Sequence, residues 1–149
     1  MILLVHLLFG AATGNLVKNP ILAIILAFLG HYILDFLPHI EYSIENISKN
    51  QWRKALPDIT RVTLDLCLGL LLIFLFSKNQ PIIYVCAFFA ILPDGLSLLN
   101  NITKIQLLKT HSDFHHEKLH FLKNKKISIF WRVSSQLIVA IFSVYLLKF

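Results

Sequence analysis

The sequence is poor in charged residues and in cysteine. Only 15% of its 149 residues are Asp, Glu, Lys or Arg, and only two are cysteines. Cys67 and Cys86 both stand inside apolar runs, which favours packing over a disulfide or a metal clip. The sequence has no Gly-rich phosphate loop, no nucleophile elbow and no His-Glu-x-x-His zinc motif. The sequence therefore gives no motif evidence for a nucleotide-binding protein, a serine hydrolase or a zinc protease.

Hydrophobic residues make up 56% of the chain, and the mean hydropathy is +0.69. A soluble helical bundle of this length remains the alternative, but a small domain cannot bury that much apolar surface. The apolar runs cover residues 2–17, 20–37, 59–77, 80–99 and 127–147. We predict an all-α, polytopic integral membrane protein of about five transmembrane helices, with the first two slightly short, forming a single domain over residues 1–149.

The first run is expected to be retained rather than cleaved as a signal peptide. No basic residue precedes it, and His6 interrupts its apolar stretch.

The distribution of basic residues predicts the orientation. If the helices alternate in direction, the N-terminus shares a side with loops 38–58 and 100–126. That side carries Lys49, Arg53, Lys54, Arg61, Lys104, Lys109, Lys118, Lys123, Lys125 and Lys126, and the other carries Lys18, Lys78 and Lys148. We therefore expect an inner-membrane protein with a cytoplasmic N-terminus and cytoplasmic long loops. The net charge of +6 fits anionic lipid head groups as partners, and no nucleic-acid partner is predicted.

Histidine and aspartate are concentrated at the run ends that face the cytoplasm in this topology. An ionisable side chain inside a hydrophobic segment costs roughly 2.5–3.5 kcal/mol on insertion scales, so it marks a functional site by default. In chain order these residues are His6, His31, Asp35, His39, Asp58, Asp65, Asp94, His111, His115, His116 and His120. Four helices and one loop thus bring imidazole and carboxylate groups to one leaflet.

This mixture of ligand types predicts a metal site. His31 and Asp35 are spaced i, i+4, so they share one face of a helix and form a two-point chelate. Imidazole nitrogen and carboxylate oxygen together suit Zn²⁺, Mn²⁺ or Fe²⁺. We predict one or two divalent metal ions, held by His6, His31, Asp35, Asp65, Asp94 and His115. His39 is the predicted proton donor to a leaving group, and His120 or His115 a ligand or proton shuttle.

Several of these residues also have structural explanations that the sequence leaves open. His6 could bond a carbonyl, His31 could simply pair with Asp35, and Asp94 could end a helix in a Pro-Asp-Gly turn. Asp58 follows Pro57 and is more readily a helix cap. Asp65, by contrast, lies deep inside its apolar run, where we expect that capping cannot explain it.

Two loop segments are predicted to lie on the membrane surface. Residues 107–121 form an interfacial helix that dips Leu and Phe side chains into lipid, and one or two of its histidines turn toward the site. Residues 41–56 form a second surface segment, with Trp52 at the interface and Arg53 and Lys54 at head groups.

Taken together, these residues resemble the small bacterial inner-membrane proteins described as membrane-bound metal-dependent hydrolases (the LexA-regulated, DUF457-like group). The resemblance rests on His6 with Gly10, His31 with Asp35 before Leu37-Pro38-His39, Leu92-Pro93-Asp94, and a His-rich loop before the last helix. It covers most of the chain. This chain departs from the family where Gly95-Leu96 replaces x-Asp, and the family's His-Arg-Gly-x-Thr-His segment is missing. The resemblance implies a hydrolase that acts on a lipid-linked or phosphate ester.

The leading hypothesis is a membrane-embedded, metal-dependent hydrolase at the cytoplasmic leaflet. The alternative is a non-catalytic metal-binding membrane protein with a structural or regulatory site, whose coordination shell would be closed. A small transporter is a third class. It is disfavoured because the polar residues stop at one leaflet instead of continuing across.

Overall fold

The computed structural model describes residues 1–103, 105–115 and 127–149. These residues form helices and connecting loops, and no β-strand occurs among them. The helices are α1 (Leu3–Leu16), α2 (Pro20–Asp35), α3 (Glu45–Ser48), the 3₁₀-helix η1 (Trp52–Lys54), α4 (Leu56–Phe76), α5 (Pro81–Thr103), α6 (Gln106–Phe114) and α7 (Ile129–Leu147). The prediction of an all-α fold is confirmed.

Polar caps in front of apolar runs fix where two of the helices begin. The side chain of Asn19 accepts hydrogen bonds from the backbone N–H groups of Ile21 and Leu22 at 3.0 and 3.1 Å, and Pro20 takes the first helical position of α2. At the start of α7, Ser128 Oγ accepts from the N–H of Phe130 at 3.2 Å. Each cap satisfies a backbone donor that has no partner within its helix.

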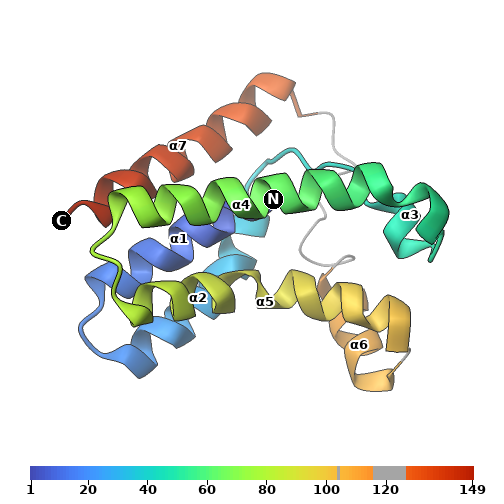
Figure 1. Cartoon of the computed structure of the whole chain (residues 1–149), viewed down its shortest axis with the longest axis horizontal. Helices are drawn as coiled ribbons and strands as arrows, with labels where there is room; N and C mark the ends of the chain where they lie inside the picture. The colour runs from blue at the N-terminus through green and yellow to red at the C-terminus, as the bar shows by residue number, and fades with distance from the viewer. Residues whose placement is uncertain (104, 116–126) are drawn as a thin grey trace.

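Helix α1 forms the centre of the bundle and packs against α2, α4, α5 and α7 (Figure 1). It is buried nearly all round, because its neighbours cover every face: its buried residues are Leu4, Val5, His6, Leu7, Leu8, Gly10, Ala11, Ala12 and Gly14. A helix that is apolar on all sides is stable in the core of a protein or in a membrane, and here the neighbouring helices bury it. His6 is therefore carried into the middle of the protein.

Two glycines let α1 approach α5 closely. A Cβ atom on Gly10 would lie 2.5 Å from Ala90 Cβ and 2.6 Å from the carbonyl oxygen of Cys86. One turn later, a Cβ atom on Gly14 would lie 2.9 Å from the carbonyl oxygen of Ile82. Small residues at this four-residue spacing allow two helix backbones to touch, as they do in membrane helix pairs.

The turn considered at Pro93-Asp94-Gly95 does not form. Helix α5 continues through all three residues to Thr103, with Pro93 inside it. Pro93 has no N–H to donate to the carbonyl of Phe89, four residues earlier. The carbonyl oxygen of the next residue, Ala90, lies 2.7 Å from Nδ1 of His31. Asp94 therefore lies inside helix α5 and does not end a helix.

Within the part of the chain that the structure describes, three helices are long and apolar enough to cross a membrane: Leu56–Phe76, Pro81–Asn100 and Ile129–Leu147. In the most apolar 18-residue stretch of α4, and likewise of α7, only 11% is buried inside the protein. Most of the apolar side chains of these two helices therefore face outward. Helices α1 and α2 have 14 and 16 residues. At about 1.5 Å per residue they span roughly 21 and 24 Å, less than the ~30 Å hydrocarbon core. Helix length therefore does not confirm the predicted count of about five spans.

The predicted surface segments are helical in part. Within residues 41–56 the chain forms only α3 and η1, and the N–H of Asn46 in α3 donates to Asp58 Oδ2 at 2.9 Å. Asp58 thus bonds the first turn of α3 from its place in α4. Of the predicted helix 107–121, α6 supplies the part to Phe114, where Leu107 and Phe114 are exposed. His116 and His120 lie outside the described residues.

Candidate metal centre

Two histidines and two aspartates from three elements converge in the interior. His31 and Asp35 come from the last turns of α2, Asp94 from the middle of α5, and His115 from the C-terminal end of α6. One ligand atom from each lies within 4.8 Å of all the others. His31, Asp35 and His115 are almost completely buried, and the Asp94 side chain is 31% exposed. This His31/Asp35/Asp94/His115 cluster could hold a metal ion.

The distances in the cluster match a coordination shell. Nε2 of His31 lies 2.9 Å from Nε2 of His115 and 3.1 Å from Asp35 Oδ2, and His115 Nε2 lies 3.1 Å from that same oxygen. Asp94 Oδ1 is 3.7 Å from His31 Nε2 and 3.8 Å from His115 Nε2. With metal–ligand bonds of about 2.0–2.1 Å, neighbouring ligand atoms of a tetrahedral site lie about 3.3–3.4 Å apart. The five distances bracket that value.

The hydrogen bond to Ala90 sets which nitrogen of His31 can bind a metal. A carbonyl oxygen can only accept, so Nδ1 of His31 carries the proton that it donates over 2.7 Å. In the neutral ring, Nε2 then presents a lone pair to Asp35 Oδ2, which is also an acceptor. One proton can join only two of the converging acceptors, whereas a divalent cation satisfies all four. Histidine ligands of metal ions are commonly oriented by such a second bond.

His6 adjoins the cluster on the other oxygen of Asp35. Its Nε2 lies 3.2 Å from Asp35 Oδ1, and its ring stacks on that of His31 with centroids 4.2 Å apart. The same oxygen lies 2.7 Å from the amino group of Met1. His6 Nδ1 is buried and has no hydrogen-bond partner among the described residues. The predicted ligand His6 is thus beside the four-residue cluster but outside it.

A cavity of about 840 Å³ opens against the cluster. Asp35 and Asp94 both contribute to its lining, while His31 and His115 do not. Asp94 is the exposed member of the cluster at this cavity, while Asp35 lines the cavity with a buried side chain and the imidazoles are packed into the protein.

The prediction for Asp65 is that capping cannot explain its position, but the structure shows that it does cap a helix. Its Oδ2 accepts the backbone N–H of Leu4, in the first turn of α1, at 3.0 Å, and the hydroxyl of Tyr42 at 3.3 Å. Asp65 therefore caps a neighbouring helix rather than its own, so the exclusion of capping is wrong. Burial, and then the negative charge of Asp65, raise the pKa of Tyr42, which keeps that hydroxyl protonated as a donor.

This geometry predicts that Asp65→Ala destabilises the protein without removing metal. The loss of a cap and of a buried acceptor costs about 1–2 kcal/mol, visible as a lower thermal midpoint in detergent. Elemental analysis of the same sample is expected to give the wild-type metal content. If metal is lost at an unchanged midpoint, Asp65 is a ligand and not a cap.

Of the two residues predicted to transfer protons, His39 lies in the described structure and His120 does not. His39 lies on the cavity wall, where Nδ1 is 2.7 Å from the carbonyl oxygen of Leu37 and Nε2 is 2.9 Å from Glu41 Oε1. His120 falls outside the described residues. The choice of His115 over the other loop histidines stays a prediction about its role, although the structure brings it to the cluster.

The sequence did not single out the environment that holds His115 in place. His111 stacks nearly parallel to His115, with ring centroids 5.9 Å apart, and its Nε2 lies 3.1 Å from the hydroxyl of Tyr32. Burial lowers the pKa of His111, and nearby His115 and His31 lower it further. The sequence carries two signals for this environment: His111 and His115 are spaced i, i+4, and Tyr32 follows His31 directly.

No protein-family model, curated protein or solved structure matches this chain. What is known of its site accordingly comes from its own residues.

Proposed function

We propose that this chain is an integral inner-membrane protein that uses a divalent metal ion to hydrolyse a lipid-linked or phosphate ester. The observation that carries the proposal is the position of the cavity. Two candidate ligands, Asp35 and Asp94, line it, and because the Asp94 side chain is 31% exposed, a metal held by the cluster would be accessible to water and to an ester from that side. Catalytic metal sites differ from structural ones by such an open position.

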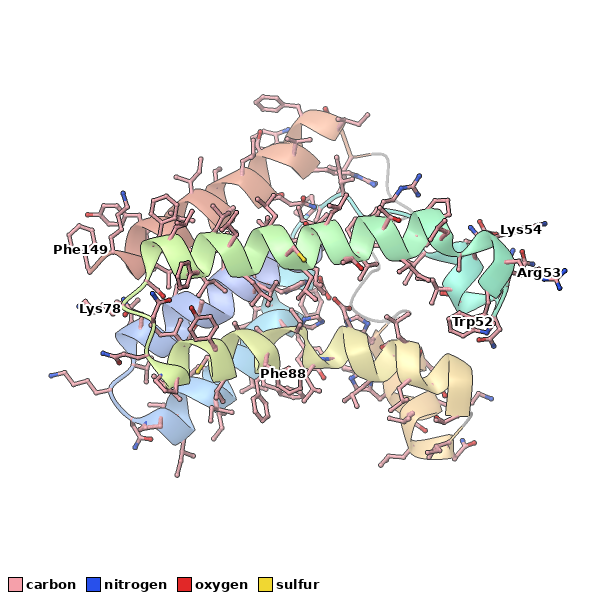
Figure 2. The ribbon with its side chains drawn as sticks, viewed as in Figure 1. Trp52, Arg53, Lys54, Lys78, Phe88 and Phe149 are labelled. Carbon is pink, nitrogen blue, oxygen red and sulfur yellow. The ribbon has the colours of Figure 1, made fainter. Side chains whose placement is uncertain are left out.

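The ends of the molecule support a membrane setting. Figure 2 shows Trp52, Arg53 and Lys54 at one end of the long axis and Lys78 and Phe149 at the other, with α4 running between them. Basic and aromatic residues at both ends of an apolar helix are typical of the two membrane surfaces. We place the Arg53–Lys54 end in the cytoplasm. Helices α4, α5 and α7 would cross fully, with α1 and α2 as shorter companions that end at the cavity, which completes a five-helix arrangement.

The metal would be held by His31, Asp35, Asp94 and His115, with His6 and Asp65 nearby. Imidazole and carboxylate ligands suit Zn²⁺, Mn²⁺ or Fe²⁺, and a second ion would have to use the Asp35 Oδ1 side near His6. Such an ion supplies Lewis acidity and makes a water molecule acidic enough to attack near neutral pH.

His39 is suited to donate a proton to the leaving oxygen. Its Nδ1–H donates to the Leu37 carbonyl, so in the neutral ring Nε2 would point a lone pair at the Glu41 carboxylate. The lone pair and the carboxylate would repel each other, and a proton held between His39 Nε2 and Glu41 Oε1 removes this repulsion. In the proposed reaction water adds to the ester centre, the bond to the leaving oxygen breaks, and His39 protonates that oxygen. The proton given up by the water then restores the His39–Glu41 pair.

An ester-release assay on the detergent-purified full chain tests this proposal. Phosphatidic acid and phosphatidylglycerol in mixed micelles are incubated with metal-loaded and chelator-treated protein, and released phosphate, glycerol phosphate and fatty acid are measured. We expect metal-dependent release of one product. His39→Gln should keep the metal but lose about 10²–10⁴ in rate. Protein that carries metal but releases none of the three products overturns the hydrolase assignment.

A structural metal site is the second candidate, and one observation favours it. The cluster already offers four ligand atoms, which is the complete shell of a tetrahedral structural site. On this alternative, removal of the metal would lower the thermal midpoint strongly, and no ester would be cleaved.

A further inference from the structure

One cation on the cavity wall has no part in the roles described so far. Arg132 lies in α7 and lines the same cavity as Asp35 and Asp94. Among the described residues that line this cavity, it is the single arginine, and no lysine accompanies it. It is half-buried.

The first half of α7 is tied to the loop that carries His39. The hydroxyl of Ser135 donates to the carbonyl oxygen of Pro38, and Gln136 Nε2 donates to the carbonyl oxygen of Ile40 at 2.6 Å. Ser135 and Gln136 follow Arg132 by three and four residues, so all three share one face of the helix. The hydrogen bonds therefore hold the face that bears Arg132 against the His39 loop.

The remaining lining is mostly apolar. It includes Leu3, Leu37, Ile40, Ile44, Val62, Leu98 and Ile129. The wall also carries Glu41, which lies 2.9 Å from His39 Nε2, and Glu45, which pairs with Lys49. With these two carboxylates paired, the arginine, the two carboxylates at the candidate metal and the aliphatic wall fit an amphiphile with an anionic head. A guanidinium fork matches the oxygens of phosphate through paired hydrogen bonds, and it keeps its charge at any physiological pH.

We propose that Arg132 binds the phosphate group of an amphiphilic substrate and makes the site select phosphate esters over carboxylic esters. This inference rests on the proposed function, because the bound phosphate would lie between Arg132 and the metal held by Asp35 and Asp94. Arg132 is then a specificity-determining residue, and the His31/Asp35/Asp94/His115 cluster forms without it.

Ligand binding by the full chain in detergent micelles tests the proposal. The probes are short-chain phosphatidic acid, the matching diacylglycerol, the matching fatty acid and inorganic phosphate, each with metal-loaded and chelator-treated protein. We expect phosphatidic acid to bind at least about tenfold more tightly than the other three. Arg132→Gln should remove this preference, and Arg132→Lys should restore part of it because lysine keeps the charge but not the fork.

Arg61→Gln is the matched control, since Arg61 lies in α4 and does not line the cavity. It should bind all four probes as the wild type does. Wild-type selectivity in Arg132→Gln, or equal binding of inorganic phosphate and phosphatidic acid, overturns the inference. The proposed function fails separately, by the absence of metal from the wild-type protein or of any ester release. Arg132-dependent binding to chelator-treated protein would still be measurable in that case.

Discussion

The variant His31→Ala/Asp35→Ala is expected to lose stoichiometric metal completely. Each residue supplies an atom to the cluster, and Asp35 Oδ2 lies 3.1 Å from the Nε2 atoms of both His31 and His115. Loss of an outer partner of a metal ligand already costs 10–100-fold in affinity, so the loss of two ligands should exceed about 100-fold. Elemental analysis of protein purified in detergent, without chelator, measures the effect.

Two further variants keep this prediction decisive if the double variant folds poorly. Asp94→Asn changes a half-exposed carboxylate in the cluster and should also lose metal, at a nearly unchanged thermal midpoint. His39→Gln changes a histidine on the same cavity that the cluster does not include, and it should keep the metal. A wild-type protein that carries no stoichiometric transition metal would refute the metal centre itself.

Gly10→Ala is expected to be the most destabilising single-methyl change in the core of the helix bundle. The new Cβ atom would lie 2.5 Å from Ala90 Cβ and 2.6 Å from the Cys86 carbonyl oxygen, and the backbone oxygen cannot move aside without shifting α5. Overpacking of this kind costs about 1–3 kcal/mol, at times more. Because α5 carries Ala90 and Asp94, metal affinity should fall together with the thermal midpoint.

Gly95→Ala is the matched control, because a Cβ atom there meets nothing within 4 Å. It lies inside α5, where alanine favours the helix over glycine by about 1 kcal/mol, so the midpoint should stay equal or rise. Equal midpoints for the Gly10 and Gly95 variants would mean that α1 and α5 do not pack as described.

The continuous apolar runs predict where the helices lie because each run is long and bounded by polar or proline residues. The cap at Asn19-Pro20 shows how much of such a boundary is local, since the bonds reach only to Ile21 and Leu22. The i, i+4 pair His31 and Asp35 could be predicted for the same reason: both residues lie on one helix, and their distance follows from its geometry.

The contributions from other elements could not be predicted in the same way. The depth of Asp65 in α4 favours a metal ligand because no cap is expected there, yet it accepts the N–H of Leu4, which lies 61 residues earlier in the first turn of α1. Pro93 and Gly95 flank Asp94 and favour a turn there, but α5 continues through all three residues. For Asp65, a contact between distant segments overrides the local pattern.

The shortness of α1 and α2 has a consequence for how an ion would reach the protein. In Figure 1 these helices run from the middle of the long axis to the end where the C-terminus lies. In the proposed orientation, apolar side chains would fill the distance from His6 and His31 to the periplasmic surface. The metal ion would therefore enter and leave the site from the cytoplasmic side only. A membrane-impermeant chelator should remove the metal from inverted vesicles, whose cytoplasmic face is outside, and leave it bound in right-side-out vesicles.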